Sequence, residues 1–169
     1  MLISKPPPSG KTELDLWNQE VRDVSNNYVQ SEFYPISDQG QLAGALKGKH
    51  PSRFLTAVND VAYIELVIPP SLRAFKEAGI RMIPTTTGSI GYTVNFQYGA
   101  IGAAFNASSK TAATVGKAVT TNLIYELDLP ITTFFTDLAP KDQLAVEFVL
   151  DALTTTTEVH ILGLYLKFI

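Results

Sequence analysis

The sequence predicts an all-β protein: a two-sheet antiparallel β-sandwich with one N-terminal helix. The first observation is a strict two-residue alternation of apolar and polar side chains, which is clearest over residues 90–98. Because side chains point alternately to the two faces of a strand, this segment has one buried and one solvated face. The apolar face carries Ile90, Tyr92, Val94, Phe96 and Tyr98.

The second observation is the number and spacing of such segments. About eight short strands, with turn signals about every ten residues and no repeat, are typical of a Greek-key sandwich. A jelly roll is the leading topology and an immunoglobulin-like sandwich is the alternative. The alternation pattern does not separate the two.

The expected elements follow one another with short connections. Pro69-Pro70 must end a strand, because proline has no N–H for the sheet ladder. Helical turns are expected over 71–78 and around 132–138, and the Gly-, Ala-, Ser- and Thr-rich residues 99–116 are expected to form a surface loop with at most one short strand. The expected strands are 53–58, 61–68, 79–83, 90–98, 119–127, 144–150 and 159–169.

The last expected strand, 159–169, is apolar on both faces. A strand that is solvated on one face alternates, so this one either lies in the centre of a sheet or packs one face against another subunit. A terminal strand of this kind has to be held in place by its neighbours.

Composition limits the function classes. A chain of 169 residues suits one domain with a sizeable core. Thirteen basic and sixteen acidic residues give a net charge of −3, which argues against a nucleic-acid partner or a polybasic membrane surface. The chain has no cysteine, which excludes a disulfide framework and a thiolate zinc site.

The N-terminal part differs from the rest. Residues 1–11 contain Pro6-Pro7-Pro8 and are expected to form an extended arm, and Thr12 can cap the helix that follows. The apolar residues of this helix are spaced 3, 4, 3, 4, a stripe that packs either on its own domain or between subunits. We therefore expect residues 1–34 to serve attachment or oligomerisation and 35–169 to form the sandwich. The candidate oligomer interface is Leu14, Trp17, Val21, Val24 and Tyr28.

The sequence shows no pattern of catalytic or metal-binding residues. The two histidines, His50 and His160, are far apart and have no carboxylate–histidine pattern beside them. The acidic pairs, such as Glu126 with Asp128, fit the solvated face of a sheet. We expect a protein that is not an enzyme, with no catalytic residue, cofactor or metal.

Phe134-Phe135 lies in a predicted loop, which places at least one ring near the surface. Such a ring either caps the core or contacts a partner. Both rings are therefore candidates for a surface contact.

Four segments in order carry a resemblance to a known class of proteins. They are Tyr63-Ile-Glu-Leu-Val-Ile-Pro-Pro70, Gly-Tyr-Thr-Val-Asn-Phe, Leu-Ala-Pro-Lys-Asp-Gln-Leu-Ala-Val-Glu-Phe and Ile-Leu-Gly-Leu-Tyr-Leu. Over residues 60–169 this order resembles the small jelly-roll structural proteins of tailed bacteriophages, which decorate the head or form short fibres. The resemblance implies a homotrimer that attaches through its N-terminal arm or helix, and it brings no catalytic residues.

The predicted function is therefore that of a virion structural protein, a capsid-decoration or fibre-type jelly roll. Its expected partners are further copies of itself and other virion proteins such as the major capsid protein. The alternative is a carbohydrate- or receptor-binding module, with a host-surface glycan as partner. The N-terminus has no signal-peptide pattern, so we expect synthesis in the host cytoplasm and a final location in the virion.

Overall fold

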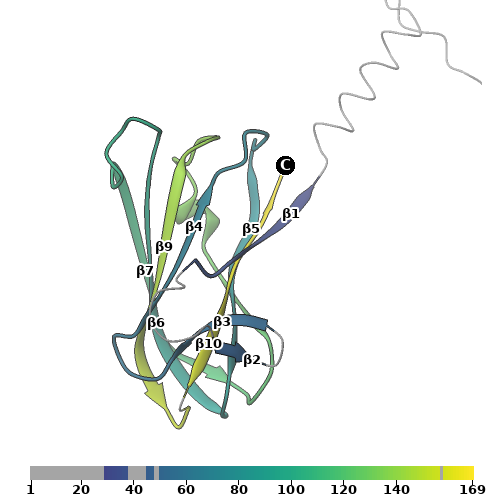
Figure 1. Ribbon diagram of the computed structural model, residues 1–169, viewed down its shortest axis with the longest axis vertical. Coiled ribbons are helices and arrows are strands. Elements are labelled where there is room, and N and C mark those ends of the chain that lie inside the picture. Colours follow the sequence, from purple (N-terminus) through teal and green to yellow (C-terminus); the bar gives the residue numbers. More distant parts are fainter. Residues whose placement is uncertain (1–28, 38–44, 48–49, 157) are drawn as a thin grey trace, which may run out of the picture.

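The computed structural model describes residues 29–37, 45–47, 50–156 and 158–169, which form two antiparallel sheets packed face to face (Figure 1). The predicted fold class is confirmed. The stripe at Leu14, Trp17, Val21, Val24 and Tyr28 lies outside the described residues. No helix among those residues has the length and apolar character needed to cross a membrane.

One sheet has six strands, in the order β2-β3-β10-β5-β8, with β1 also bonded to β10. The strand β10 is its centre, because β5 pairs along one side of it and β3 and then β1 pair along the other. The bounds are β1 Gln30–Pro35, β2 Ala45–Lys47, β3 His50–Leu55, β5 Phe75–Pro84, β8 Tyr125–Asp128 and β10 Val159–Phe168.

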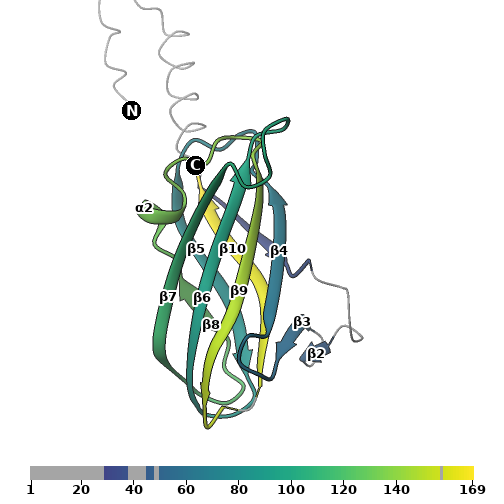
Figure 2. The same ribbon diagram turned by 90° about the vertical axis from the view of Figure 1, so that its left-hand side faces the viewer.

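The other sheet has four strands, in the order β4-β9-β6-β7, and Figure 2 shows it in front of the first. Its long central strands, β6 and β9, pair from Ser89 with Thr154 to Gly99 with Gln143. The bounds are β4 Val61–Val67, β6 Gly88–Gly99, β7 Ser108–Val119 and β9 Gln143–Thr154.

The strand order identifies a jelly roll. From β4 onward the chain passes back and forth between the sheets, and only β6 and β7 form a hairpin within one sheet. The order β4-β9-β6-β7 facing β3-β10-β5-β8 is that of two interleaved Greek keys. This decides between the two sandwich topologies that the alternation pattern left open.

The core fills the space between the sheets and follows the predicted alternation. Residues 90, 92, 94, 96 and 98 all face it, and Phe96 has no exposed surface. Tyr92 stacks on Phe148 with ring centroids 5.1 Å apart, and Phe96 meets Phe134 at 4.2 Å. Phe134 belongs to the short helix α2, Ile131–Phe134, so the expected turn at 132–138 is helical in its first part.

The strand β10 has an irregularity at Leu162. Pairing with β5 shifts between Ile161 and Gly163, and the Leu162 carbonyl accepts a hydrogen bond of 3.1 Å from the Ile36 N–H. A Cβ on Gly163 would lie 2.2 Å from the Tyr34 carbonyl oxygen. Only a glycine at position 163 leaves room for the backbone of β1 at Tyr34, so Gly163 allows β1 to pair with β10.

Three predictions about elements were wrong. The expected helical turn at 71–78 includes the start of strand β5, which begins at Phe75. Residues 99–116 contain most of β7, a strand of twelve residues. The expected strand 119–127 is broken by a turn in which Asn122 has a φ of +57°, so that β7 ends at Val119 and β8 begins at Tyr125.

The strand β1 spans the expected boundary between residues 34 and 35. That strand is bonded to β10 from Gln30 paired with Phe168 to Pro35 paired with Gly163. The described sandwich therefore begins before residue 35.

Candidate functional site

A row of hydrogen-bonded side chains crosses the outer face of the four-stranded sheet. The Tyr63 hydroxyl donates to Oε1 of Glu147 over 2.8 Å, and Nδ2 of Asn95 donates to Oε2 of the same carboxylate over 2.8 Å. The Thr111 hydroxyl donates to Oδ1 of Asn95, also over 2.8 Å. These four residues, which we call the polar row, are direct cross-strand neighbours on β4, β9, β6 and β7.

The polar row fixes its own geometry. Glu147 accepts on both carboxylate oxygens, and the donor and acceptor ends of the Asn95 amide are both used. An ionised carboxylate has about four lone-pair sites, so Glu147 retains capacity to accept hydrogen bonds from a ligand. The side chains are therefore held in place before any ligand arrives.

A hollow lies next to the polar row because of one small residue. Ala145 on β9 is the direct cross-strand neighbour of Glu65 on β4 and of Gln97 on β6. Its side chain is only a methyl group, so the space between the two longer side chains is left open. One part of the hollow, of about 110 Å³, is bordered by Tyr63, Asn95 and Glu147 together with Gln97 and Ala145. The larger part, of about 380 Å³, shares Gln97 and Ala145 with it.

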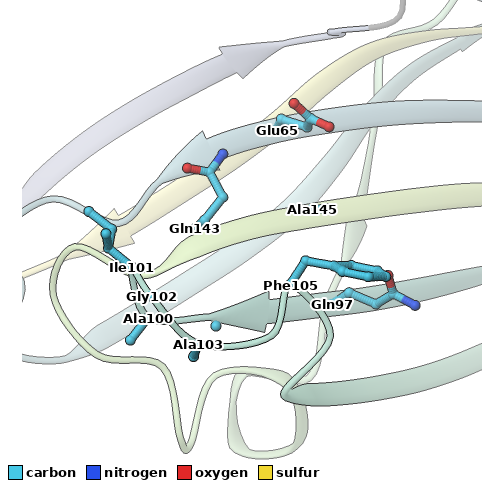
Figure 3. Close-up of a pocket in the computed structure, with 10 residues that line it drawn as sticks. Glu65, Gln97, Ala100, Ile101, Gly102, Ala103, Phe105, Gln143 and Ala145 are labelled. Atoms are coloured by element: carbon cyan, nitrogen blue, oxygen red, sulfur yellow. The ribbon is translucent and has the colours of Figure 1, made fainter.

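The loop between β6 and β7 walls the larger part. Two hydrogen-bonded turns shape it, in which the Ala103 N–H donates to the Ala100 carbonyl and the Ala107 N–H donates to the Ala104 carbonyl. Figure 3 shows Phe105 beside Gln97 on one side of the hollow, with Glu65 and Gln143 on the other. The Phe105 ring is 79% exposed, and Tyr63 at the other end is 41% exposed.

The charge of the hollow is negative. Glu65 and Glu147 line it, and its described lining residues include no lysine, arginine or histidine. Cross-strand diagonal neighbours such as these lie about 7 Å apart, so the two carboxylates act on the same small volume. The negative potential in the hollow repels anionic ligands, whereas neutral or cationic ligands are not repelled.

The structure corrects the interpretation of Phe134 and Phe135 as surface contacts. Their exposed fractions are 0% and 5%, and both rings pack on Phe96. Phe134 at the end of α2 and Phe135 directly after it both point into the core and cap it, which is one of the two roles expected from the sequence. Phe105, in the loop between β6 and β7, is an exposed aromatic residue that the sequence did not single out.

The structure brings Ser52 next to His160, which has Glu158 two positions before it in the sequence. Ser52 Oγ lies 2.9 Å from His160 Nδ1, and His160 Nε2 lies 2.6 Å from Glu158 Oε1. Ser52 and His160 are 5% and 4% exposed. Such burial suits a polar contact that fastens β3 to the start of β10, where His160 pairs with Phe54.

Glu126 of the acidic pair named above and two further surface carboxylates each bind another side chain. Glu126 binds Arg81 at 2.9 Å, Asp137 binds Lys110 at 2.8 Å, and Asp151 accepts from the Thr93 hydroxyl at 2.6 Å. The Lys110 ammonium holds the pKa of Asp137 below its usual value, mainly through this hydrogen bond. Within the described ranges, no group of three His, Asp or Glu side chains is placed to hold a metal ion.

No protein-family model and no curated protein sequence matches the chain. Among solved structures, it is similar to the CBM36-1 domain of a multidomain xylanase from the hindgut metagenome of Trinervitermes trinervoides. The TM-score is 0.45 and the identity 11%, over 81% of this chain and 96% of that one.

The chain is also similar to two further solved structures. One is a carbohydrate-binding module CBM36 in complex with calcium and xylotriose, with a TM-score of 0.42 and 14% identity over 80% of this chain and 97% of that one. The other is from desmodium yellow mottle tymovirus, with a TM-score of 0.28 and 12% identity over 99% and 94%. At these values the likenesses say nothing about ligand or activity.

Proposed function

We propose that this β-sandwich is a carbohydrate-binding module that holds a glycan in the hollow beside the polar row. The observation that carries the proposal is the combination of two exposed aromatic residues, Tyr63 and Phe105, with fixed polar side chains between them. A sugar ring has apolar C–H faces and a rim of hydroxyls. Aromatic rings pack against the faces, and amides and carboxylates bind the hydroxyls.

The polar groups suit hydroxyl recognition because they offer both donors and acceptors. Glu147 accepts only, whereas the Gln97 and Gln143 amides can donate and accept. Since Glu65 and Glu147 make the hollow negative, the favoured ligand class is a neutral glycan and not a sialylated or uronic one. The hollow is open to solvent along the sheet, which suits one stretch of a longer chain.

The experiment is a glycan-array screen of the whole chain followed by calorimetry on the best neutral glycan. Phe105→Ala and Gln97→Ala are each expected to weaken binding about tenfold, equivalent to about 1.4 kcal/mol. The matched controls are Leu123→Ala, which removes another exposed apolar side chain, and Thr93→Ala, which lies on the same face of β6 outside the hollow. Binding that all four variants keep would place the glycan elsewhere and overturn the proposal.

A second candidate function is that of a virion structural protein, a homotrimer attached to the major capsid protein or another virion protein. The supporting observation is that β1 is bonded to the central strand β10 over all of its length. The first described strand is therefore part of the six-stranded sheet, so an attachment made by the residues before it would hold the whole domain. A sandwich displayed in this way could also bind a host-surface glycan.

The native mass of the chain with and without residues 1–28 tests this candidate. A trimer that becomes a monomer on truncation would support the proposed interface at Leu14, Trp17, Val21, Val24 and Tyr28. A trimer that survives truncation would move the interface to the sandwich, and a monomer in both cases would remove the trimer from consideration.

A further inference from the structure

The strand β7 is a long edge strand. It has twelve residues and pairs with β6 on one side, while its other side has no backbone partner among the described residues. A long uncovered edge offers a row of N–H and C=O groups to any other strand, and proteins normally shorten, cover or charge such edges.

The other sheet edges are protected in these ways. In the same sheet, β4 is covered by the segment after β1, because the Ser37 N–H donates to the Tyr63 carbonyl at 2.9 Å and Ser37 Oγ accepts from the Glu65 N–H at 2.7 Å. In the six-stranded sheet, β8 has four residues, β2 has three, and β1 ends in Pro35. Of the described edges, only β7 is both long and without a backbone hydrogen-bond partner.

The residues of β7 leave its edge accessible. Lysine is a common guard of edges, and β7 has two. Lys117 is exposed but lies beyond the regular segment, and the Lys110 ammonium binds Asp137 at 2.8 Å and the Thr136 hydroxyl at 3.3 Å. Pairing with β6 is regular from Ser108 to Thr114 and then bulges, with Gly116 at a φ of +72°. The regular part, residues 108–114, carries small side chains apart from Lys110.

We propose that two copies of this chain pair edge to edge through β7, in antiparallel orientation about a two-fold axis at Thr111. Identical strands are self-complementary in this arrangement. Thr111 is the middle of the regular segment, and the register sets Lys110 opposite Ala112 and Ser109 opposite Ala113 of the second copy. No two lysines face each other, so the pairing has no repulsive cross-strand pair.

The pairing joins the two four-stranded sheets into one continuous sheet. The two polar rows then meet at Thr111, and both hollows lie on the same face of the joined sheet. The pair interface is independent of the N-terminal stripe, and it does not depend on whether the hollow binds a glycan.

A single cysteine tests the pairing and its register, because the chain has no cysteine of its own. Directly opposed residues of antiparallel strands have Cα atoms about 4.5–5.5 Å apart, which lies within the range for a disulfide. Thr111→Cys in the full chain is expected to form a covalent dimer under mild oxidation. Ser109→Cys is the matched control, since the two copies of that position would be about 13 Å apart along the strand and would stay uncross-linked.

The native mass of the unmodified chain and of Thr111→Lys completes the test. The Lys variant puts two like charges opposite each other at the two-fold axis and is expected to lose the pair, with unchanged circular dichroism. A cross-link at Thr111 and not at Ser109, together with this loss, supports the proposal. Equal cross-linking at both positions, or none at Thr111, overturns it, and in the latter case the edge is left for a strand of a different protein.

Discussion

The Glu147 carboxylate accepts a hydrogen bond of 2.8 Å from the Asn95 amide, directly across the pair of strands β9 and β6. The other end of that amide accepts from the Thr111 hydroxyl, and the amide cannot turn over without setting its oxygen against the Glu147 carboxylate, an acceptor against an acceptor. Asn95 thus links Thr111 of β7 to the Glu147 carboxylate through hydrogen bonds at both ends of its amide.

Asn95→Asp is expected to destabilise the sandwich although it is isosteric. The new carboxylate faces Glu147 with no proton between them, which costs about 1–3 kcal/mol at pH 7. The repulsion raises the pKa of the pair, so the deficit should shrink at pH 4, where one proton can be shared. Urea unfolding at both pH values measures it. Gln97→Glu, one position along the face, is the control with the same charge change, and an equal deficit there would contradict the explanation.

Gly163→Ala is expected to destabilise the protein by more than about 1 kcal/mol. The added Cβ would meet the Tyr34 carbonyl, which β1 cannot withdraw without losing its pairing to β10. Two causes are possible, the steric clash of the Cβ and the positive φ of the backbone. Gly102→Ala separates them, because Gly102 has a φ of +91° but nothing within 4 Å of an added Cβ. Thermal unfolding compares the two variants, and equal losses would assign the effect to backbone conformation alone.

Phe134→Ala is expected to cost about 3–5 kcal/mol, because it empties a fully buried site against Phe96. The same substitution at the exposed Phe105 should change the free energy of unfolding by less than about 0.5 kcal/mol. Denaturant unfolding of both variants checks the assignment of one ring to the core and the other to the hollow. A small loss of unfolding free energy for Phe134→Ala would contradict the burial of that ring in the core.

The stability of the connection between β3 and β4 is expected to depend on pH through Asp60. The N–H groups of Thr56 and Ala57 donate to its Oδ2 at 2.7 and 2.9 Å. The Thr56 N–H contributes most to holding the pKa of Asp60 below its usual value. A lowered pKa in the folded state stabilises the fold above the unfolded pKa of about 3.9, and this contribution disappears as the pH falls through the folded value.

Comparing Asp60→Asn with the unmodified chain from pH 7 to pH 2 measures this contribution. The difference in unfolding free energy should be constant at neutral pH and shrink toward pH 2. Thr56→Val keeps the N–H donor and should retain the pH dependence of the unmodified chain. A difference for Asp60→Asn that does not change with pH would assign its effect to something other than the carboxylate charge.

The fold was predictable where side chains alternate between apolar and polar. The core positions of β6 and the apolar β10 could be read directly, because burial of one or both faces shapes the composition of a strand. The strand β7 could not, since its outward residues include Ser109, Thr111 and Ala113 and its inward ones are Ser, Lys, Ala and Thr. Such small residues are equally typical of a loop.

The candidate site was not predictable for a different reason. Tyr63, Asn95, Thr111 and Glu147 are polar or amphipathic residues on the solvated faces of four strands, and each is unremarkable in its own segment. Only the register of β4, β9, β6 and β7 puts them in one row. Ala145, which creates the hollow, is an ordinary residue in an alternating strand. Likewise, the contact of Ser52 with His160 spans 108 positions.

The position of β10 has a consequence for how the protein is made. Its partners β1, β3 and β5 all precede it in the sequence, so they leave the ribosome before the strand that joins them exists. Before β10 is made, the described pairs β2–β3 and β5–β8 of this sheet can form, but the edges that bind β10 stay unpaired in the nascent chain. A chain that stops before residue 159 lacks the strand that joins β1, β3 and β5, so it cannot complete the six-stranded sheet.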